Sequence, residues 1–436
     1  MQRREVAISS ADVNLLCKNV SKLGGYALAL LDHFDLGIDK ALFKKHLAET
    51  GQHLRSISND DGPFSITLRP KGYGDRALIE EANLSWNYPQ TLRFASGACM
   101  ISQKYQRWMS PENLRRALIA KVLYKCQTGI LDDVIDKGDY NYLEAKELYH
   151  LVLSSMTDPS LNPNALMKRL ISTLREGQLD LFDLIVAITS NFNILFTLSP
   201  HGSDLFYEME ILDERVALGQ ALTMFQKEPN LDLGQVASIS QSFYSPEDDV
   251  AWYERLANHV SGGTRYNLID ISFVDRKFKL SKLKSFLKGW YFFDIVIVFL
   301  NNIVSVYQDL GGGIANLSLV AMREKDLTLD TLEGYDPGLT LEDYERHLLR
   351  LANLASKGLE NVLKDFPDPQ QYYPFIAVMM PVVMLAEWIG KSDEMIHTYI
   401  ETLAPGIRRA AEKSATYGKE VFPIPTRGKR ASPPVG

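Results

Sequence analysis

Three aspartates, Asp132, Asp133 and Asp136, stand close together in the stretch GILDDVIDKGDYN, directly after an apolar-periodic run. Residues four apart share one face of a helix, so Asp132 and Asp136 line up if the run is helical. Carboxylates held this close raise one another's pKa unless a cation binds, and their oxygens suit hard divalent ions such as Mg²⁺. The cluster therefore indicates a magnesium site, although an isolated cluster of this kind is also typical of a solvated acidic helix end.

A second set of oxygen-bearing side chains interrupts the apolar stretch FFDIVIVFLNNIVSVYQDLGGG. Asn301, Ser305 and Asp309 are spaced by four and four, which places an amide oxygen, a hydroxyl and a carboxylate along one helix face. A buried polar group costs about 1–3 kcal/mol unless it is satisfied. Hydrogen bonding inside a helical bundle could satisfy any one of them, but three at this spacing favour a shared metal ion.

The pair DDVID and NNIVSVYQD resembles the two metal-binding motifs of class I terpene cyclases, a DDxxD followed by an N/D-D-x-x-S/T-x-x-x-E segment. The resemblance implies that both sets of residues bind a cluster of three Mg²⁺ ions, which holds a prenyl diphosphate. Asn302 stands where the family usually has aspartate, Asp309 where it has glutamate, and 169 residues separate Asp132 from Asn301, a long gap. These departures point to the non-standard fungal humulene synthase-like sesquiterpene cyclases.

The same resemblance implies an arginine that senses diphosphate, followed by a break in a helix. The stretch WYERLANHVSGGTRYNLID offers Arg255, 46 residues before Asn301, then a break at residues 261–263, and then Arg265. Either arginine fits the role. Surface arginines beside an ordinary loop are the alternative.

Two cavity walls follow from the four-residue spacing of the motifs. One runs back from Asp132 to Tyr124, and the other from Asn301 to Phe293. Aromatic faces stabilise cations, and the candidates for contact with a carbocation are Tyr124, Trp290 and Phe293. Aromatic residues at helical spacing are, however, more often plain core.

Helical periodicity dominates the elements that must position these residues, so the sequence predicts an all-α protein. Ser110-Pro111-Glu112 predicts the start of a helix over about 112–136, and Thr340 opens another. FSITLRP, residues 64–70, is the best strand candidate. Breaks are expected between the helices at residues 157–164, 226–232, 244–249, 311–313 and 333–338. The resemblance implies a class I terpenoid synthase-like helical bundle around a central apolar cavity.

The chain is expected to divide into three parts. Residues 1–90 should form a helical and irregular capping segment that is not independent, residues 91–425 the cyclase-like α domain, and residues 426–436 a disordered basic tail. Two apolar stretches, 290–307 and 372–390, contain charged residues or prolines and are expected to be buried helices without stable membrane insertion.

Composition narrows the class of partner. The 436 residues are 46% hydrophobic with a net charge of −7, and basic residues are scattered, so nucleic acid is not an expected partner. Three distant cysteines and the lack of a signal-like apolar segment after the first residues favour a cytoplasmic location. A homodimer is left open.

The sequence thus predicts a Mg²⁺-dependent cyclase that ionises an acyclic prenyl diphosphate and closes it to a sesquiterpene such as humulene, with release of diphosphate. Farnesyl diphosphate is the expected substrate by analogy with the family. A chain-elongating prenyl diphosphate synthase shares the fold but should carry a second DDxxD late in the chain, and none follows residue 136. A non-catalytic helical protein that binds a metal or a partner at its acidic face is the other alternative.

Overall fold

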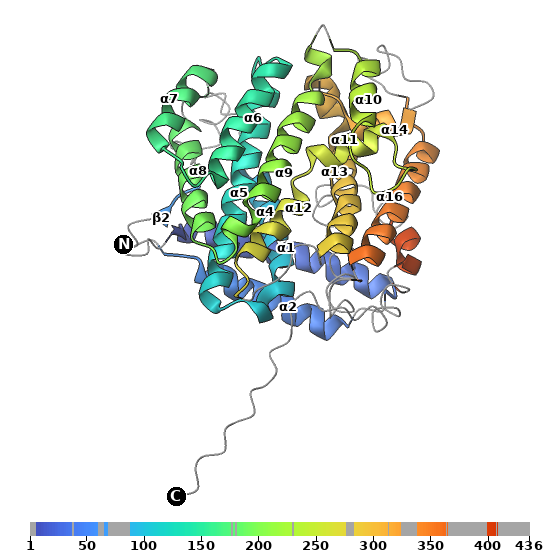
Figure 1. Ribbon diagram of the computed structural model, residues 1–436. Helices are drawn as coiled ribbons and strands as arrows, with labels where there is room; N and C mark the ends of the chain where they lie inside the picture. Colours follow the sequence, from blue (N-terminus) through green and yellow to red (C-terminus); the bar gives the residue numbers. More distant parts are fainter. Residues whose placement is uncertain are drawn as a thin grey trace, which may run out of the picture.

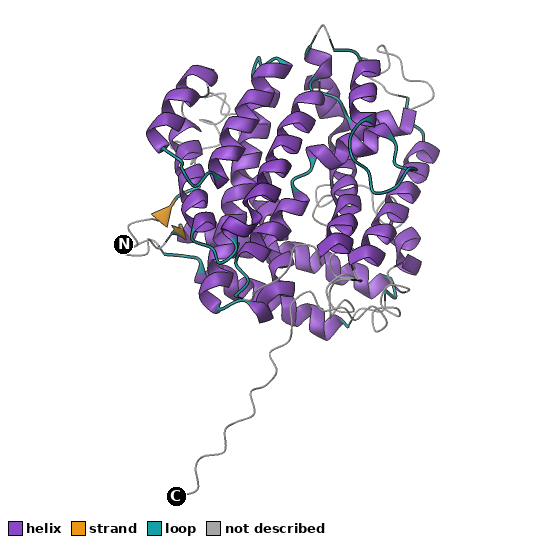
Figure 2. Cartoon of the chain, in the orientation of Figure 1, coloured by secondary structure: helices purple, strands orange, loops and turns teal. Residues whose placement is uncertain are grey.

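The computed structural model describes residues 6–36, 39–59, 65–68, 88–175, 178, 181–228, 231–275, 283–312, 314–323, 338–362, 364, 399–406 and 408. Within these residues the chain is almost entirely helical, which confirms the expected all-α class (Figure 2). The first half contains α1 (Ser10–His33), α2 (Lys40–Ser56), α4 (Tyr88–Ile101), η1 (Ser102–Trp108), α5 (Pro111–Lys137), α6 (Tyr142–Thr157), α7 (Pro163–Thr173) and α8 (Phe182–Thr197). The second half contains α9 (Gly202–Leu222), η3 (Phe225–Lys227), α10 (Leu233–Gln241), α11 (Trp252–Val260), α12 (Gly263–Ser272), α13 (Lys284–Gly312), α14 (Leu317–Arg323) and α16 (Leu341–Val362).

The helix ends follow the predicted capping signals. Ser110 accepts a hydrogen bond from the Asn113 amide at the start of α5, and Pro111 occupies the first helical turn. Thr340 caps α16 in the same way, through the Asp343 amide. The breaks expected at 157–164 and 226–232 separate α6 from α7 and α9 from α10. Local chemistry therefore accounts for where these helices begin.

The strand prediction holds only for a short piece. Strand β2 (Ser65–Ile66) pairs in parallel with β1 (Ala7–Ile8), and Ser9 donates its amide to the Ile66 carbonyl. This pairing ties the chain before α1 to the segment after α2.

Two helices, α5 and α13, form opposite parts of the bundle and are labelled in Figure 1. Helix α5 packs against α4, α8 and α12, whereas α13 packs most extensively against α16 and also against α11, α12 and α14. Helices α6 and α9 pack against each other, and α9 also contacts α11. Helix α12 therefore contacts both motif-bearing helices.

The N-terminal helices share the main apolar core. Helix α1 packs against α2 and α4, and α2 also reaches α5 (Figure 1). Leu16 and Phe43 belong to the same cluster of buried apolar side chains as Leu131 and Ile295. The expected tail at 426–436 lies outside the described residues.

One helix in the described part of the chain, Lys284–Ile303, is long and apolar enough to cross a membrane by length and composition. Because 72% of that apolar window is buried inside the protein, its apolar character is explained by packing within the bundle. The second apolar stretch, 372–390, lies outside the described residues.

Candidate active site

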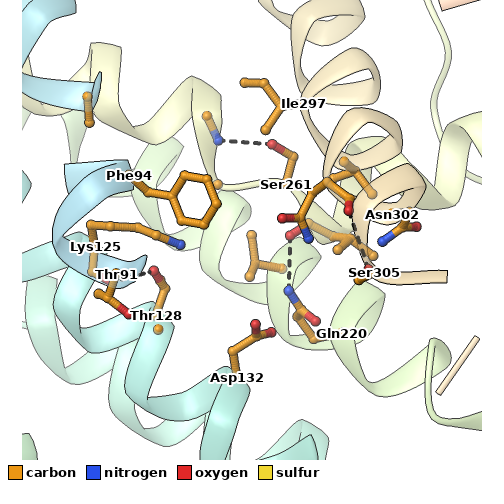
Figure 3. Close-up of a pocket in the computed structure, with 18 of the residues that line it drawn as sticks. Thr91, Phe94, Lys125, Thr128, Asp132, Gln220, Ser261, Ile297, Asn302 and Ser305 are labelled. Atoms are coloured by element: carbon orange, nitrogen blue, oxygen red, sulfur yellow. Dashed lines mark hydrogen bonds between the residues drawn. The ribbon is translucent and has the colours of Figure 1, made fainter. Parts of the chain in front are cut away.

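A cavity of about 340 Å³ opens between α4, α5, α9 and α13, a size typical of small-molecule sites. Polar and apolar side chains both line its wall, and the polar side chain of Lys125 lies beside the ring of Phe94 (Figure 3). The polar residues include all six that the sequence predicts as metal ligands: Asp132, Asp133, Asp136, Asn301, Ser305 and Asp309. The apolar residues include Phe94, Ala98, Met100, Ile101, Val216, Val260, Trp290, Ile297, Val298, Ile314 and Leu317.

The aspartates of the first motif lie in the last two turns of α5. Burial raises the pKa of Asp136 well above its usual value, and the negative charges of Asp132 and Asp309 raise it further. Tyr149, from α6, donates its hydroxyl to Asp132 Oδ1 at 3.3 Å. This end of α5 is therefore a place where added positive charge would be strongly stabilised.

Two of the three side chains of the second motif, those of Ser305 and Asp309, are hydrogen-bonded to each other on α13. Ser305 Oγ donates to Asp309 Oδ2 at 2.6 Å, and also lies 3.3 Å from the Asn301 carbonyl oxygen. Asn316, beyond the end of α13, donates a second hydrogen bond to Asp309 Oδ2 at 2.7 Å. Burial raises the pKa of Asp309 to about 6, while these two hydrogen bonds lower it. Asn316 was not among the predicted site residues.

The two motifs face each other closely enough to interact electrostatically, because the charge of Asp309 raises the pKa of Asp136. Their donors are carboxylate, amide and hydroxyl oxygens, which fit Mg²⁺ rather than a softer metal. No group of three His, Cys, Asp or Glu side chains in the described ranges could by itself hold a metal ion.

Asn302, which stands where the resembled motif has aspartate, has a structural partner. Its side-chain oxygen accepts the Leu317 amide at 2.9 Å, and its carbonyl oxygen accepts a hydrogen bond from Asn316 at 2.7 Å. These contacts fix the start of α14 against α13. An amide serves here as well as a carboxylate because the role is to cap a helix.

The predicted helix break lies between α11 and α12 and forms part of the cavity wall at Ser261, Gly262 and Gly263. A Cβ atom at Gly262 would collide with the Tyr124 hydroxyl, and one at Gly263 with the Asp294 carboxylate. Close approach from two helices therefore requires both glycines.

Asp294, on α13, holds the segment between α11 and α12 in place through hydrogen bonds. Its carboxylate accepts hydrogen bonds from Ser261 Oγ at 2.9 Å and from the Thr264 amide at 3.0 Å, and also from the Thr264 hydroxyl. Burial raises the pKa of Asp294 to about 7, against the lowering effect of these hydrogen bonds.

Neither arginine proposed as a diphosphate sensor lines the cavity, which corrects the prediction for Arg255 and Arg265. Arg255 donates to the carbonyl oxygens of Gln241, Phe243 and Val250, so its guanidinium binds the chain before α11. Arg265 is fully buried in an ion pair with Asp213 of α9. Its guanidinium lies 4.7 Å from the centre of the Tyr124 ring, behind the cavity wall.

Two of the three predicted aromatic residues, Tyr124 and Trp290, line the cavity, but Phe293 does not. The ring of Phe293 packs on Gly358 of α16 instead. A helix turns about 100° per residue, so a line drawn in steps of four drifts by about 40° at each step. Phe293 is eight residues from Asn301 and has turned away, whereas Trp290, eleven residues away, faces almost the same way as Asn301.

The structure adds three aromatic residues to the wall, Phe94, Tyr149 and Tyr266. Tyr266 makes an edge-to-face contact with Tyr124, at 5.2 Å between ring centres. None of the three lies on a motif helix, so sequence spacing gave no signal for them.

Two lysines lie near the acidic motif and were also missed. Lys125 lines the cavity two helical turns before Asp132 on α5. Lys227, in η3, donates to the Asp136 carbonyl oxygen at 2.7 Å, and its charge lowers the pKa of Asp136. A separation of seven residues keeps Lys125 on the same helix face as Asp132, so the sequence did hold a signal for it.

The remaining acidic residues serve other purposes. Asp139 lies in the exposed turn after α5, and its carbonyl oxygen accepts a hydrogen bond from Arg175, as expected for a turn residue. A second acidic stretch, PEDD at residues 246–249, precedes α11 (Trp252–Val260). Its Glu247 and Asp249 are both paired with Lys357 of α16, at 2.7 and 2.9 Å.

Comparison with known proteins adds no relative: no family model matches the chain, and no curated protein matches its sequence. Within the described residues, the coarse class is therefore an almost entirely helical protein with a cavity lined by oxygen-bearing, basic and apolar side chains.

Proposed function

We propose that this protein is a Mg²⁺-dependent class I terpene cyclase that converts an acyclic prenyl diphosphate, farnesyl diphosphate by analogy, to a cyclic sesquiterpene. One observation carries the proposal. Oxygen-bearing side chains from α5 and α13 line the same cavity as aliphatic and aromatic residues such as Phe94, Trp290 and Ile297. Such a site suits a molecule with an anionic end and a long hydrocarbon tail. The helical bundle would then be of the class I terpenoid synthase type.

The oxygen-bearing residues would bind Mg²⁺ and the diphosphate, and the aromatic residues would contact the hydrocarbon tail. Bound Mg²⁺ would supply charge that stabilises the leaving diphosphate. Asp132, Asp136 and Asp309 would hold it from two helices, and Asn301 and Ser305 would complete the oxygen donors. The tail would extend along the apolar side chains of the wall, where the rings of Tyr124, Tyr266 and Trp290 can face a developing positive charge. The apolar side chains beside the tail would also limit the access of water to the cation.

The direct test is incubation of the purified protein with Mg²⁺ and geranyl, farnesyl or geranylgeranyl diphosphate, followed by gas chromatography of the extract. A cyclic hydrocarbon or alcohol that disappears with a chelator is the expected result. Folded protein that yields no such product from any of the three would overturn the proposal and leave a non-catalytic binding protein.

A second incubation distinguishes a chain-elongating prenyl diphosphate synthase from a cyclase. Isopentenyl diphosphate and an allylic diphosphate are supplied together, and the products are analysed after dephosphorylation. A longer prenyl alcohol would identify a prenyl diphosphate synthase, whereas the cyclase predicts that the allylic diphosphate alone is consumed.

A further inference from the structure

Lys125 places a positive charge inside the cavity on the same helix as the acidic motif. It lies seven residues before Asp132, hence almost directly in line with it and about 10 Å further along the axis of α5. Its side chain extends from α5 into the cavity beside Phe94 (Figure 3). An ammonium group in a cavity wall that also carries the acidic motif of α5 and the ring of Phe94 needs an explanation.

The surroundings of Lys125 leave its donors directed at the cavity. Its Nζ lies 5.2 Å from the centre of the Phe94 ring, a cation–π contact that uses none of its three N–H groups. No acceptor among the described residues is hydrogen-bonded to it, which contrasts with Lys121 one turn earlier. Lys121 donates to Asp270 at 2.7 Å and to Ser102 at 2.9 Å and is wholly buried behind the wall. Lys121 is a core residue, whereas Lys125 is available to a ligand.

We propose that Lys125 binds a phosphate group of the diphosphate ligand, the role that the sequence had assigned to Arg255 or Arg265. The inference deepens the proposed function and rests on it for the identity of the whole substrate. Three free N–H donors on a partly desolvated ammonium group match the oxygens of a phosphate. Arg255 and Arg265 cannot replace it, since both use their guanidinium groups elsewhere.

The position of Lys125 also indicates which of the two phosphate groups of the diphosphate it contacts. Asp132 and Asp136 lie at the C-terminal end of α5, and Lys125 lies on the side of Asp132 that leads back to Tyr124. The hydrocarbon tail must lie against the apolar side chains of the cavity. Lys125 therefore contacts the phosphate that carries the ester oxygen, and it neutralises charge that develops there when the carbon–oxygen bond breaks.

The experiment measures two affinities with opposite expected changes. Wild-type protein, Lys125→Met and Lys125→Arg are titrated with Mg²⁺ alone, and then with inorganic diphosphate in excess Mg²⁺, by calorimetry. Lys125→Met should weaken diphosphate binding roughly 10- to 100-fold, because a charged hydrogen-bond donor is lost. The same variant should bind Mg²⁺ alone as tightly as the wild type or a few-fold more tightly, since a nearby positive charge is removed.

Two controls separate ligand binding from general damage. Lys146→Met removes an equal charge from the exposed face of α6 and should leave both affinities unchanged. Lys125→Arg keeps the charge and should retain most of the diphosphate affinity. If Lys125→Met does not fold, Lys125→Gln takes its place.

The outcomes distinguish this inference from the proposed function. Lys125→Met protein that binds diphosphate within about threefold of wild type, or that loses Mg²⁺ and diphosphate affinity together, overturns the role of Lys125 even if the protein makes a terpene. Wild-type protein without affinity for Mg²⁺-diphosphate also overturns it. If diphosphate binding depends on Lys125 but no prenyl diphosphate is cyclised, the lysine site stands and the cyclase proposal falls.

Discussion

The end of α5 and the second half of α13 hold similar oxygen donors but are built on different principles. On α5, several carboxylates stand together and raise the pKa of Asp136. On α13, one carboxylate, Asp309, is combined with a hydroxyl and an amide, and Ser305 and Asn316 already hydrogen-bond to it. The first region concentrates negative charge, whereas the second already holds its carboxylate in place by hydrogen bonds. Activity should therefore be most sensitive to the loss of a carboxylate on α5. On α13 it should be most sensitive to the loss of the hydrogen bonds that hold Asp309.

The largest effect is expected for Asp132→Ala, which removes a carboxylate from the charged region. Product formation in the terpene assay should fall roughly 100-fold or more, because stabilisation of the leaving group depends on it. The melting temperature in chelator should not fall, since repulsion with Asp136 is relieved. Asp139→Ala, in the exposed turn after α5, is the matched control and should behave as wild type. Equal activity of the two variants would refute the metal site on α5.

The second-largest effect is expected when Asp309 on α13 loses the hydrogen bond that Asn316 donates to it. Asn316→Leu removes the donor to Asp309 and also the acceptor of the Leu319 amide at the start of α14. Activity should fall about 10- to 100-fold, and the free energy of unfolding by about 1–2 kcal/mol.

A matched control tests whether the activity loss merely follows the stability loss. Asn162→Leu removes a comparable cap, at the start of α7 and away from the cavity wall. It should lower the free energy of unfolding by a similar amount with unchanged activity. Parallel losses in both variants would show that Asn316 does not position Asp309.

A smaller effect is expected when Asp132 on α5 loses the hydrogen bond that Tyr149 donates to it. Tyr149→Phe removes only a 3.3 Å hydrogen bond to Asp132, so activity should fall about 2- to 10-fold. Tyr140→Phe removes a shorter hydrogen bond, to Gln178 at 2.6 Å, from a ring that does not line the cavity. That variant should lose stability but keep its activity. If Tyr149→Phe lost as much activity as Asn316→Leu, the two regions would not differ in their dependence on hydrogen bonding.

The smallest effect is a change in how stability depends on pH. The pKa of Asp309 is about 6 in the folded protein, above roughly 3.9 for an unfolded chain, so its contribution to stability is present at low pH. That contribution is lost as the pH rises from about 4 through 6. In chelator, the decline in melting temperature between pH 4.5 and 7.5 should be about 1–3 °C smaller in Asp309→Asn than in wild type. An identical decline would mean that Asp309 titrates normally.

Much of the architecture could be predicted from local signals. The start of α5 at Ser110-Pro111, the cap of α16 at Thr340 and the break before α12 all depend on a few adjacent residues. The six predicted oxygen donors also reach one cavity, because spacing of three or four fixes a helix face without reference to other helices.

The errors arose where the answer depended on a partner helix. Steps of four residues placed Phe293 on the cavity wall, but the accumulated rotation turns it toward α16. Arg265 looked accessible beside two glycines, yet its charge is paired with Asp213 on α9, 52 residues earlier in the chain. No local pattern reports such a partner.

The sequence by itself determined which side chains could share a metal ion, where the helices begin, and that glycine would interrupt the chain before α12. Only the tertiary structure decided which positive charge enters the cavity, and that Asp294 of α13 fastens the interruption between α11 and α12. The physical reason is that helix periodicity and capping act within a few residues, whereas burial and ion pairing depend on which helices pack together. The role of a charged residue is set by that packing, as the contrast between Lys121 and Lys125 on a single helix shows.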